Sequence, residues 1–491
     1  MAFEVMPKTI TAAVSPAYKR QSVEWQMINA LLGGTGVMRA HGEIYLPRHE
    51  NESQKNYAKR LQKAVLAPFF KRAVNFSTGK AFYKPISIVP VAEKGTLSDK
   101  ILELVNDANK KGDSFAKFCN TSFKDAWAKG LGFIYVEAPA FDTQEVRTQA
   151  QVEAAGYRPY MVYVPAEDVL DIEINEDGQI VYVKLLERFT EFNKSLNVTE
   201  EKTRIRVVTT TEIAVFERPT VAVTTASRQV KQTPEFTEYA IMPNYPITNN
   251  IGLVPLVPIY TGEKKADFEC VSALIDLAYT NVQYFQDEST HENAIAFAEF
   301  PLLILTGSDG KEITIGANKM IAIKDDKANL KYVEHSGKAL EAGRLNLEDL
   351  RVKAGYCGLK VLMSDSADKS SGQNTATEAE IDAIDANSEL KVAADNFVDS
   401  VNYALWLYEL YLGTAQENGQ ANYVAKLDGL YSVSQSDVRE IAALMELKSA
   451  GEMRLETLYS ELKRRGTVSD DFDIASEVAF AEENRNNPEG V

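Results

Sequence analysis

The loop SDSADKSSGQN (Ser364–Asn374) runs directly into the stretch TATEAEIDAIDANSELKVAADNFVDSVNYALWLYELYLG (Thr375–Gly413), and this junction decides the fold. The second stretch has no proline, and its first glycine is Gly413, so the sequence predicts one continuous helix. At ~1.5 Å per residue this helix would be roughly 55 Å long, whereas an ordinary globular helix has about 11–12 residues. A helix of this length needs a partner surface, which is either its own domain or, as we favour, neighbouring copies of the chain.

The two halves of the long helix differ in character. The first half is acidic, and the second half carries apolar residues at the three-four spacing that is typical of a buried helix face. One interpretation is a core helix with a solvated start, and the other is an acidic start that faces water inside an oligomer. In the second case Tyr403 and Trp406 would contact a neighbouring subunit or domain. The acidic residues are Glu378, Glu380, Asp382, Asp385 and Glu389, and the apolar residues are Leu390, Ala394, Phe397, Val401, Ala404, Leu405, Tyr408 and Leu412.

The composition is that of a folded protein, with 45% hydrophobic and 25% charged residues in a chain of 491 residues. This length allows about two to four domains. The formal net charge is -17, whereas a protein that binds free nucleic acid tightly normally has a basic surplus. The charge therefore argues against tight DNA or RNA binding, but it allows a surface past which DNA slides, because like charge prevents sticking.

The three cysteines, Cys119, Cys270 and Cys357, lie far apart without a CxxC spacing. This pattern predicts free thiols in a reducing cytoplasm rather than a disulfide framework. Residues Met1–Pro16 lack the basic-then-apolar pattern of a signal peptide, and no window approaches about 18 uninterrupted apolar residues. We therefore expect neither a secretion signal nor a membrane span.

The chain before the long helix predicts an α+β fold in which helices flank a β-rich insert. Residues Asp177-Gly178 supply a hairpin turn within this insert. The expected helices are Tyr18–Leu32, Asn51–Phe82 with a kink at Pro68, Leu97–Asn109, Ser114–Gly130, a helix from Ala266, and Lys338–Gly355. The expected strands are Glu43–Pro47, Ile86–Val91, Gly132–Ala138, Tyr160–Val164, Val169–Ile174, Ile180–Phe189, Arg204–Val208, Glu212–Glu217, Glu238–Ile241, Phe300–Leu305, Ile313–Ile315 and Met320–Ile323.

Three further features are expected in the same part of the chain and at its end. The helix from Ala266 has one face that becomes polar toward its C-terminal end, with Leu274, Leu277, Asn281, Phe285 and Glu288. Two more helices follow the long one, at Ser436–Ala450 and Leu455–Gly466. The acidic segment Asp470–Val491 is expected to be mobile.

No catalytic motif emerges from the residues. The four histidines form no HxH, HExxH or HxxE pair, and Gly33–Gly36 is not followed by the GK[ST] of a phosphate-binding loop. The sequence therefore predicts no catalytic residue, no metal site and no cofactor. Two alternatives stay open: a helical scaffold or adaptor that binds through the long helix, and a metal-dependent nucleic-acid enzyme built from dispersed carboxylates.

The order of parts resembles the core of tailed-phage portal proteins, the head–tail connectors. Helix, short β-containing tip, helix, small polar loop and very long helix follow one another in that order. Short motifs resemble one uncharacterised family of phage portal proteins. These motifs are Trp25, Gly34-Thr35-Gly36-Val37-Met38-Arg39, Tyr45-Leu46-Pro47, Glu52, Tyr57, Arg60-Leu61, Thr375-Ala376-Thr377-Glu378-Ala379 and Asn387-Ser388-Glu389-Leu390.

The resemblance implies a portal fold with a β-rich wing insert, two stem helices, a small β-containing clip and a very long helix. By this likeness the parts would be a wing at residues 1–265, stem helices at 266–296 and 338–358, a clip at 297–337, a tunnel loop at 359–374, the long helix and its return to the wing at 375–433, and a crown-like C-terminus at 434–491.

The resemblance also implies a function. Portal proteins form rings of twelve copies around a DNA channel at one capsid vertex, receive the terminase motor during packaging, and later hold head–tail adaptors. By this likeness the partners would be further copies of the chain, the major capsid protein, the terminase large subunit, a head–tail adaptor and double-stranded DNA without sequence specificity. The location would be the virion, with the host cytoplasm during assembly, and no membrane is implied.

Two groups of residues would face the DNA in such a ring. Acidic side chains would keep the channel wall repulsive, and lysines in a mobile loop would make weak, salt-sensitive contacts. For Lys360 and Lys369 simple solubility is an equal alternative. The tunnel-loop candidates are Lys360, Ser364, Asp365, Lys369, Ser370, Ser371 and Gly372, and the channel-wall candidates are Asp276, Asp287, Glu288, Glu292 and Glu378.

Overall fold

The computed structural model describes most of the chain in two compact units. One unit takes in Met1–Asp368 and Glu389–Gly429, and the other takes in Lys369–Ser388 and Leu430–Val491. The described residues are 6–92, 95–138, 158–193, 197–218, 238–298, 302–306, 329–333, 337–359, 376–416, 420–429, 434–464, 468 and 472–486. The fold is α+β, as predicted.

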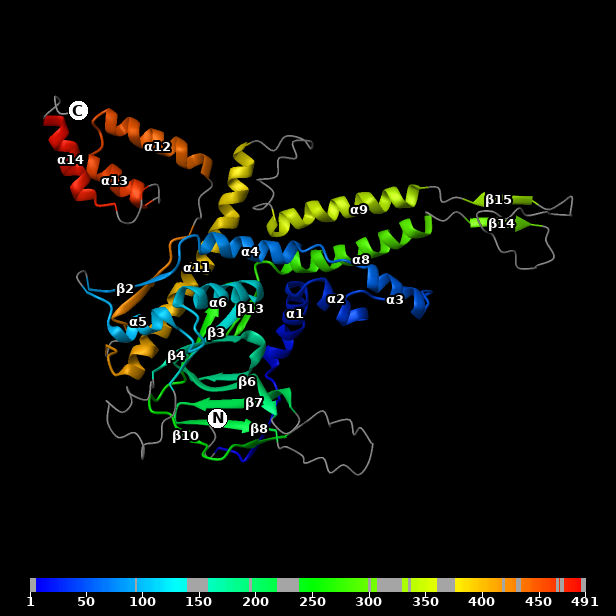
Figure 1. The fold of residues 1–491 in the computed structure, drawn as a ribbon, viewed down its shortest axis with the longest axis horizontal. Helices are drawn as coiled ribbons and strands as arrows, with labels where there is room; N and C mark the ends of the chain where they lie inside the picture. Colours follow the sequence, from blue (N-terminus) through cyan, green and yellow to red (C-terminus); the bar gives the residue numbers. More distant parts are fainter. Residues whose placement is uncertain are drawn as a thin grey trace. The chain divides into compact units, whose positions relative to one another are not determined.

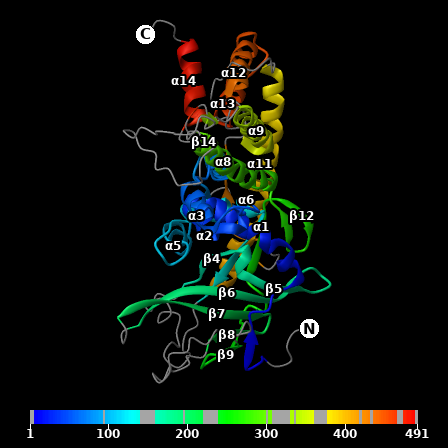
Figure 2. The same cartoon turned by 90° about the vertical axis from the view of Figure 1, so that its right-hand side faces the viewer.

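The first unit contains a seven-stranded sheet in the order β1-β9-β8-β7-β6-β5, with β10 paired to β8. Every pairing in it is antiparallel, and Gly178 turns the chain between β5 and β6 with a φ of 78°. Strands β6 and β7 extend beyond their neighbours (Figure 2). The strands are β1 (Thr9–Thr11), β5 (Val169–Ile174), β6 (Ile180–Asn193), β7 (Val198–Thr209), β8 (Glu212–Glu217), β9 (Glu238–Ile241) and β10 (Ile247–Thr248).

A second sheet, in the order β11-β3-β4, lies under helix α6 (Figure 1). Six consecutive residues of β3 are buried, which explains why this strand reads as a nearly continuous apolar run. Trp25 packs into the same core as residues of β3, β4, β5 and β11. The elements are α6 (Phe115–Lys129), β3 (Leu131–Glu137), β4 (Tyr160–Pro165) and β11 (Leu256–Tyr260).

The N-terminal motif residues lie together in one corner of this unit. The Thr35 hydroxyl accepts from the backbone N–H of Leu66 at 3.1 Å, and Arg39 Nε donates to the carbonyl of Ala64 at 2.8 Å. Arg60 is buried, and its guanidinium forms an ion pair of 2.8 Å with Glu52. The helices here are α1 (Pro16–Gly33), α2 (Thr35–His41), α3 (Gln54–Lys63), α4 (Phe69–Ala81) and α5 (Asp99–Asn106).

The predicted long helix is confirmed as α11 (Ala376–Leu412), a single helix of 37 residues. Its apolar face is also confirmed: Phe397, Val401 and Tyr408 are fully buried, and the Phe397 ring contacts the ring of Phe123. The surface that covers this half is therefore the chain's own unit. Our preference for neighbouring copies as the covering surface is wrong for this half of the helix.

The second unit contains the first residues of α11 and three further helices. These are α12 (Ser434–Ser449), α13 (Leu455–Arg464) and α14 (Ile474–Asn486). The acidic segment Asp470–Val491, which we expected to be mobile, contains helix α14, and its mobility stays a prediction. An Asp473 carboxylate oxygen accepts from the backbone N–H of Ala475 at 3.1 Å, so the acidic residue caps a helix that the composition did not indicate.

Two predictions near the N-terminus are wrong. The strand predicted at Glu43–Pro47 is a 3-10 turn, η1 (Gly42–Ile44), because Gly42 has a φ of 53° and its carbonyl accepts from Tyr45 and Leu46. The single kinked helix predicted at Asn51–Phe82 is two helices, α3 and α4. Helix α3 ends at Lys63, and Pro68 is the N-cap residue after which α4 begins, so the proline lies between two helices rather than within one.

The helix predicted from Ala266 begins later, as α8 (Ile275–Ala298). Before it, β12 (Glu263–Ala266) and β13 (Glu269–Val271) form a hairpin whose turn places Phe268 at a φ of 60°. Two short strands far apart in the sequence, β2 (Ser87–Pro90) and β16 (Tyr423–Lys426), pair antiparallel with each other within the first unit. The strands predicted at Ile313–Ile315 and Met320–Ile323 lie outside the described residues.

Candidate functional site

The candidate functional site is the helical hairpin of α8 and α9 (Lys338–Ala354), together with α11. Between the two helices, β14 (Leu302–Thr306) pairs antiparallel with β15 (Asn329–Val333). Polar contacts show that α8 and α9 are antiparallel: Asn346 donates to Asp287 at 3.0 Å, and Arg351 donates to the Tyr284 hydroxyl at 2.9 Å. The two helices lie side by side in Figure 1.

Small residues bring the two helices close together. A Cβ on Gly343 would lie 2.6 Å from His291 Nδ1, so the ring of His291 occupies the space that a side chain would need. Leu350 and Ala354 are buried on the same side of α9. The hairpin is therefore a packed pair and not two loosely joined helices.

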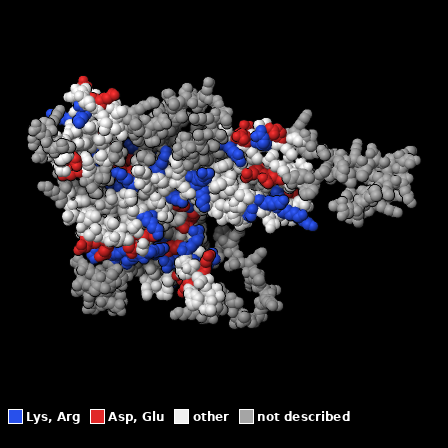
Figure 3. Space-filling view, turned by 45° about the horizontal axis from the view of Figure 1, so that its top comes forward, with Lys and Arg blue, Asp and Glu red and all other residues white. Residues whose placement is uncertain are grey.

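The four acidic channel-wall candidates on α8 lie at different positions around the helix. At 100° per residue, Asp276 and Asp287 share one side of the helix, whereas Glu292 lies roughly opposite. Asp276 and Glu292 are exposed, and Asp287 is half-buried beside Asn346. Figure 3 shows acidic and basic side chains interspersed over this part of the molecule. One channel wall cannot be lined by all four carboxylates of a single straight helix, so their channel role stays a prediction.

Glu288 has the most constrained environment of the four. The Tyr284 hydroxyl donates to Glu288 Oε1 at 3.2 Å, and the guanidinium of Arg351 lies 5.6 Å from the Tyr284 ring centroid. Burial raises the pKa of the Glu288 carboxyl, against the lowering effects of the Tyr284 hydroxyl and the Arg351 charge. This carboxyl thus belongs to the packing between α8 and α9.

A surface cavity of about 300 Å³ lies where α3 meets α8. Its walls carry both signs of charge, so it is not a purely repulsive surface. The lining residues are Arg60, Lys63, Ala64, Val65, Glu288, Ser289, Glu292, Asn293, Ile295 and Ala296.

The remaining predicted site residues are placed only in part. Glu378 lies in the first turns of α11. All seven tunnel-loop candidates, Lys360 to Gly372, lie outside the described residues. Tyr403 is 45% exposed and stacks on Trp406, with ring centroids 5.3 Å apart. This aromatic pair lies on the outer side of α11, and its contact with a neighbouring subunit or domain stays a prediction.

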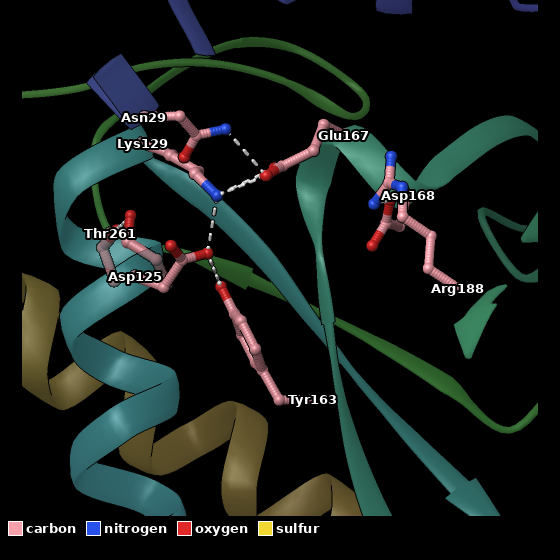
Figure 4. Close-up of polar contacts among 9 residues, drawn as sticks. Asn29, Asp125, Lys129, Tyr163, Glu167, Asp168, Arg188 and Thr261 are labelled. Atoms are coloured by element: carbon pink, nitrogen blue, oxygen red, sulfur yellow. Dashed lines mark hydrogen bonds and ion pairs between the residues drawn. The ribbon is translucent and has the colours of Figure 1, made fainter. Parts of the chain in front are cut away.

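A buried polar network in the first unit was not predicted from the sequence. The Lys129 ammonium lies between two carboxylates, 3.0 Å from Asp125 and 2.7 Å from Glu167, and its side chain is 2% exposed (Figure 4). Tyr163 donates to Asp125 at 2.8 Å, and Asn29 donates to Glu167 at 3.0 Å. The network joins α1, α6, β4 and the 3-10 turn η2 (Ala166–Asp168).

Both carboxylates of the network share the Lys129 ammonium, and each accepts from one further side chain, Tyr163 for Asp125 and Asn29 for Glu167. In the part of the chain that the structure describes, no group of three or more His, Cys, Asp or Glu side chains is placed to hold a metal ion. The described helices also include none with the length and apolarity of a bilayer span.

Asp168, next to this network, gives a pH-dependent prediction. Burial raises the pKa of its carboxyl to about 6 even though Arg188 forms an ion pair with it, and the charge of Glu167 adds to the rise. The folded chain therefore binds a proton at Asp168 more tightly than the unfolded chain does. The stability that the protonated carboxyl contributes is lost as the pH rises from the ordinary pKa of an aspartate toward about 6. Asp168→Asn should remove that loss, about 1–2 kcal/mol between pH 4 and pH 7 after solvent screening.

Urea unfolding at several pH values checks this expectation. The exposed Asp177, changed to Asn, is the matched control and should leave the pH profile unchanged. If the unfolding free energies of Asp168→Asn and of the wild type change in parallel with pH, the Asp168 carboxyl has the same pKa in the folded and the unfolded chain.

The fold defines an α+β protein whose helical hairpin precedes a 37-residue helix. A family model described as a domain of unknown function, DUF4055, matches residues 273–412, which take in α8, β14, β15, α9 and α11. No curated protein is significantly similar to the chain.

Solved structures of gene transfer agent (GTA) particles contain similar chains. One, from the neck of an empty GTA particle computed with C6 symmetry, is 11% identical, with a TM-score of 0.44 over 81% of this chain and 90% of that chain. Another, from the neck of a native particle computed with C12 symmetry, is 12% identical, with a TM-score of 0.41 over 81% and 90% of the two chains. A third, from the virion of the native particle, is 12% identical, with a TM-score of 0.43 over 87% and 98%.

Proposed function

We propose that copies of this chain close into a ring at one vertex of a tailed-phage capsid and act as its portal. The ring would conduct double-stranded DNA during packaging and ejection, without sequence specificity and without catalysis of its own. It would dock the terminase large subunit during packaging and a head–tail adaptor afterwards, and it would contact the major capsid protein. Its location would be the virion, after assembly in the host cytoplasm.

The observation that carries this proposal is the order and pairing of α8, β14, β15, α9 and α11. The structure has an antiparallel helical hairpin, a strand ladder between its two helices, and a single long helix that follows in the chain. This is the order of stem, clip, stem and long helix that the sequence resemblance implies. The acidity of the chain supports the role as well, because a conduit should not hold phosphates tightly.

The mass and symmetry of the purified assembly test the proposal. Twelve chains of 54.5 kDa would give a ring of roughly 650 kDa. Head-to-tail association closes into a ring only if the rotation between neighbouring copies is a whole fraction of a full turn, without translation along the axis. Native mass spectrometry should show this species, and negative-stain images should show rings with a central hole.

Other outcomes would favour other functions. A stable monomer or a two-fold dimer under all assembly conditions would contradict the portal and favour a helical scaffold or adaptor. Metal-dependent turnover of DNA by the purified chain would favour an enzyme with dispersed carboxylates.

A further inference from the structure

Helix α3 carries three lysines on one exposed side. Lys55, Lys59 and Lys63 are spaced by four residues, so they form a stripe along the helix, which we call the lysine stripe. Tyr57 and Arg60, on the other side of α3, are buried. No lysine of the stripe forms a hydrogen bond or ion pair with another described residue, although Lys63 lines the cavity that Glu288 and Glu292 also line. Like charges four residues apart destabilise a helix, so an acidic partner would relieve a cost that the isolated chain bears.

Helix α9 carries two neighbouring carboxylates on its outer side, flanked by the exposed Arg344 and Lys353. Glu348 and Asp349 are exposed, and neither forms an ion pair within the described part of the chain. Two apolar side chains accompany them at helical spacing: Leu345 is 49% exposed and Val352 is 51% exposed. Leu350 is buried on the opposite side of α9. We call Leu345, Glu348, Asp349 and Val352 the acidic α9 face, and it points away from α8.

The two surfaces lie on opposite sides of one layer of helices. Helix α8 contacts both α9 and α3, and it lies between them in both views (Figures 1 and 2). In the space-filling view, basic side chains gather along the lower edge of the hairpin region, and acidic side chains with basic ones among them lie above that edge (Figure 3). Head-to-tail association requires two different surfaces that are complementary and face in different directions, and this layer supplies such a pair.

We propose that the lysine stripe of one copy docks against the acidic α9 face of the adjacent copy. This inference rests on the proposed ring and names a contact within it. Opposite charges would bring the two helices into register, and Leu345 and Val352 would lose their exposure to water at the contact. Together the two surfaces explain how chains with a net charge of -17 associate, because the contact pairs a local basic surface with a local acidic one.

DNA is a weaker candidate for the same stripe. Three lysines on a chain with a large negative charge would give only a weak and strongly salt-dependent attraction to phosphates. A DNA contact would also leave the exposed Leu345 and Val352 unexplained, whereas a second copy covers both surfaces at once.

Charge reversal in both surfaces tests the proposal. The triple change Lys55→Glu, Lys59→Glu and Lys63→Glu, and separately the double change Glu348→Lys and Asp349→Lys, should each raise the protein concentration needed for half-assembly by about ten-fold or more, because like charges then face each other. The combined variant, with all five changes, should recover most of the lost assembly. Native mass spectrometry at fixed ionic strength measures the fraction in rings.

A control with the same change in net charge separates contact from overall charge. Lys8, Lys19 and Lys111 are exposed and lie outside α3, and their combined change to Glu should leave assembly near the wild-type level. Circular dichroism melts establish that each variant is folded, and the double change on α9 provides an independent route if the α3 variant unfolds.

The outcomes distinguish this inference from the proposed function. If the wild type forms rings and both charge-reversed variants assemble equally well, the docking contact is wrong, whereas the proposed portal function is not contradicted. A wild-type chain that never forms rings would overturn both. If the stripe variant keeps its rings but loses salt-sensitive retention of DNA, the stripe faces DNA and the docking contact is wrong. Loss of assembly in the control variant as well would assign the effect to net charge, again against the contact.

Discussion

Replacing Asn281 with leucine is expected to lower the free energy of unfolding of the first unit by about 2–4 kcal/mol. Asn281 is fully buried on α8, and its side-chain amide is bonded on both sides. Its oxygen accepts from the backbone N–H of Phe70 at 3.0 Å, and its nitrogen donates to the carbonyl of Ala67 at 2.8 Å. Leucine has nearly the same size but would leave the buried N–H of Phe70 without a partner, which costs about 1–3 kcal/mol. It would also remove one of the two hydrogen bonds of the Ala67 carbonyl, which still accepts from the backbone N–H of Phe69 at 2.9 Å.

The reason for the large effect is that Asn281 acts as a cap for a distant helix. Helix α4 begins after Pro68, which gives it no side-chain cap of its own. The first backbone N–H groups of a helix need an acceptor, and a side chain from α8 supplies one for Phe70. Asn281 therefore fixes the connection between α3 and α4 to the first stem helix of the proposed portal.

Tryptophan fluorescence during denaturant unfolding measures this change, since Trp25, Trp127 and Trp406 all belong to the first unit. The matched control is Gln283→Ala, which removes an exposed amide from the same helix and should change the stability by less than about 0.5 kcal/mol. If Asn281→Leu unfolds at the wild-type denaturant concentration, the two backbone groups find other partners and the capping role is wrong.

Asn281 also shows how far the sequence predicts this fold. The apolar spacing around it was sufficient to predict a helix with Leu277 and Phe285 on one buried side, because that spacing is local. Its bond to Phe70 joins residues 211 positions apart, and no local pattern contains that information. The same limit explains the error at Asn51–Phe82, where helical spacing on both sides of Pro68 suggested continuity although the chain turns there.

In the candidate site, too, the local features were predictable from the sequence and the contacts between distant elements were not. The long helix and its apolar face were predictable, since 37 residues without proline or glycine leave few alternatives. The helical positions of Asp276, Asp287, Glu288 and Glu292 spread these carboxylates over nearly half the circumference of α8, and their role at a channel wall stays a prediction. The lysine stripe was equally readable as a period of four, but its meaning depends on α8 lying between α3 and α9, which only the tertiary structure shows.

The polar network around Lys129 was missed for a related reason. Lys129 ends a helix whose buried side is otherwise aromatic and small, so the sequence marks it as an ordinary lysine in a last turn. Its partner Glu167 follows β4, and the two meet only because β3 and β4 pair over their whole length. A charged residue at a position that helical spacing places toward the core is the one signal that was available.

Lys129→Met is expected to lower the free energy of unfolding by about 2–4 kcal/mol, because it removes the buried ammonium that two partly buried carboxylates share. Methionine fills a similar volume, so the loss is one of charge and hydrogen bonding rather than of packing. The companion variant Lys129→Met with Glu167→Gln removes the unpaired charge as well and should recover a substantial part of the loss. The recovery distinguishes an uncompensated carboxylate from a simple cavity, which the second change would not repair.

The pH dependence of the single variant provides an independent measurement. Burial tends to raise the pKa of Glu167, but the Lys129 charge and its hydrogen bonds outweigh burial and hold the pKa below the ordinary value. In the wild type this carboxylate therefore contributes stability above its ordinary pKa and loses it as the pH falls through the lowered value. Without Lys129, only the hydrogen bonds from Asn29 and from the backbone N–H of Glu167 still oppose the effect of burial on the pKa of Glu167. Lys129→Met should therefore lose less stability than the wild type on the same descent. The difference in unfolding free energy between wild type and variant should be largest near pH 7 and should shrink toward pH 4. A difference that stays constant over this range would contradict the idea that Lys129 compensates the charge of these carboxylates.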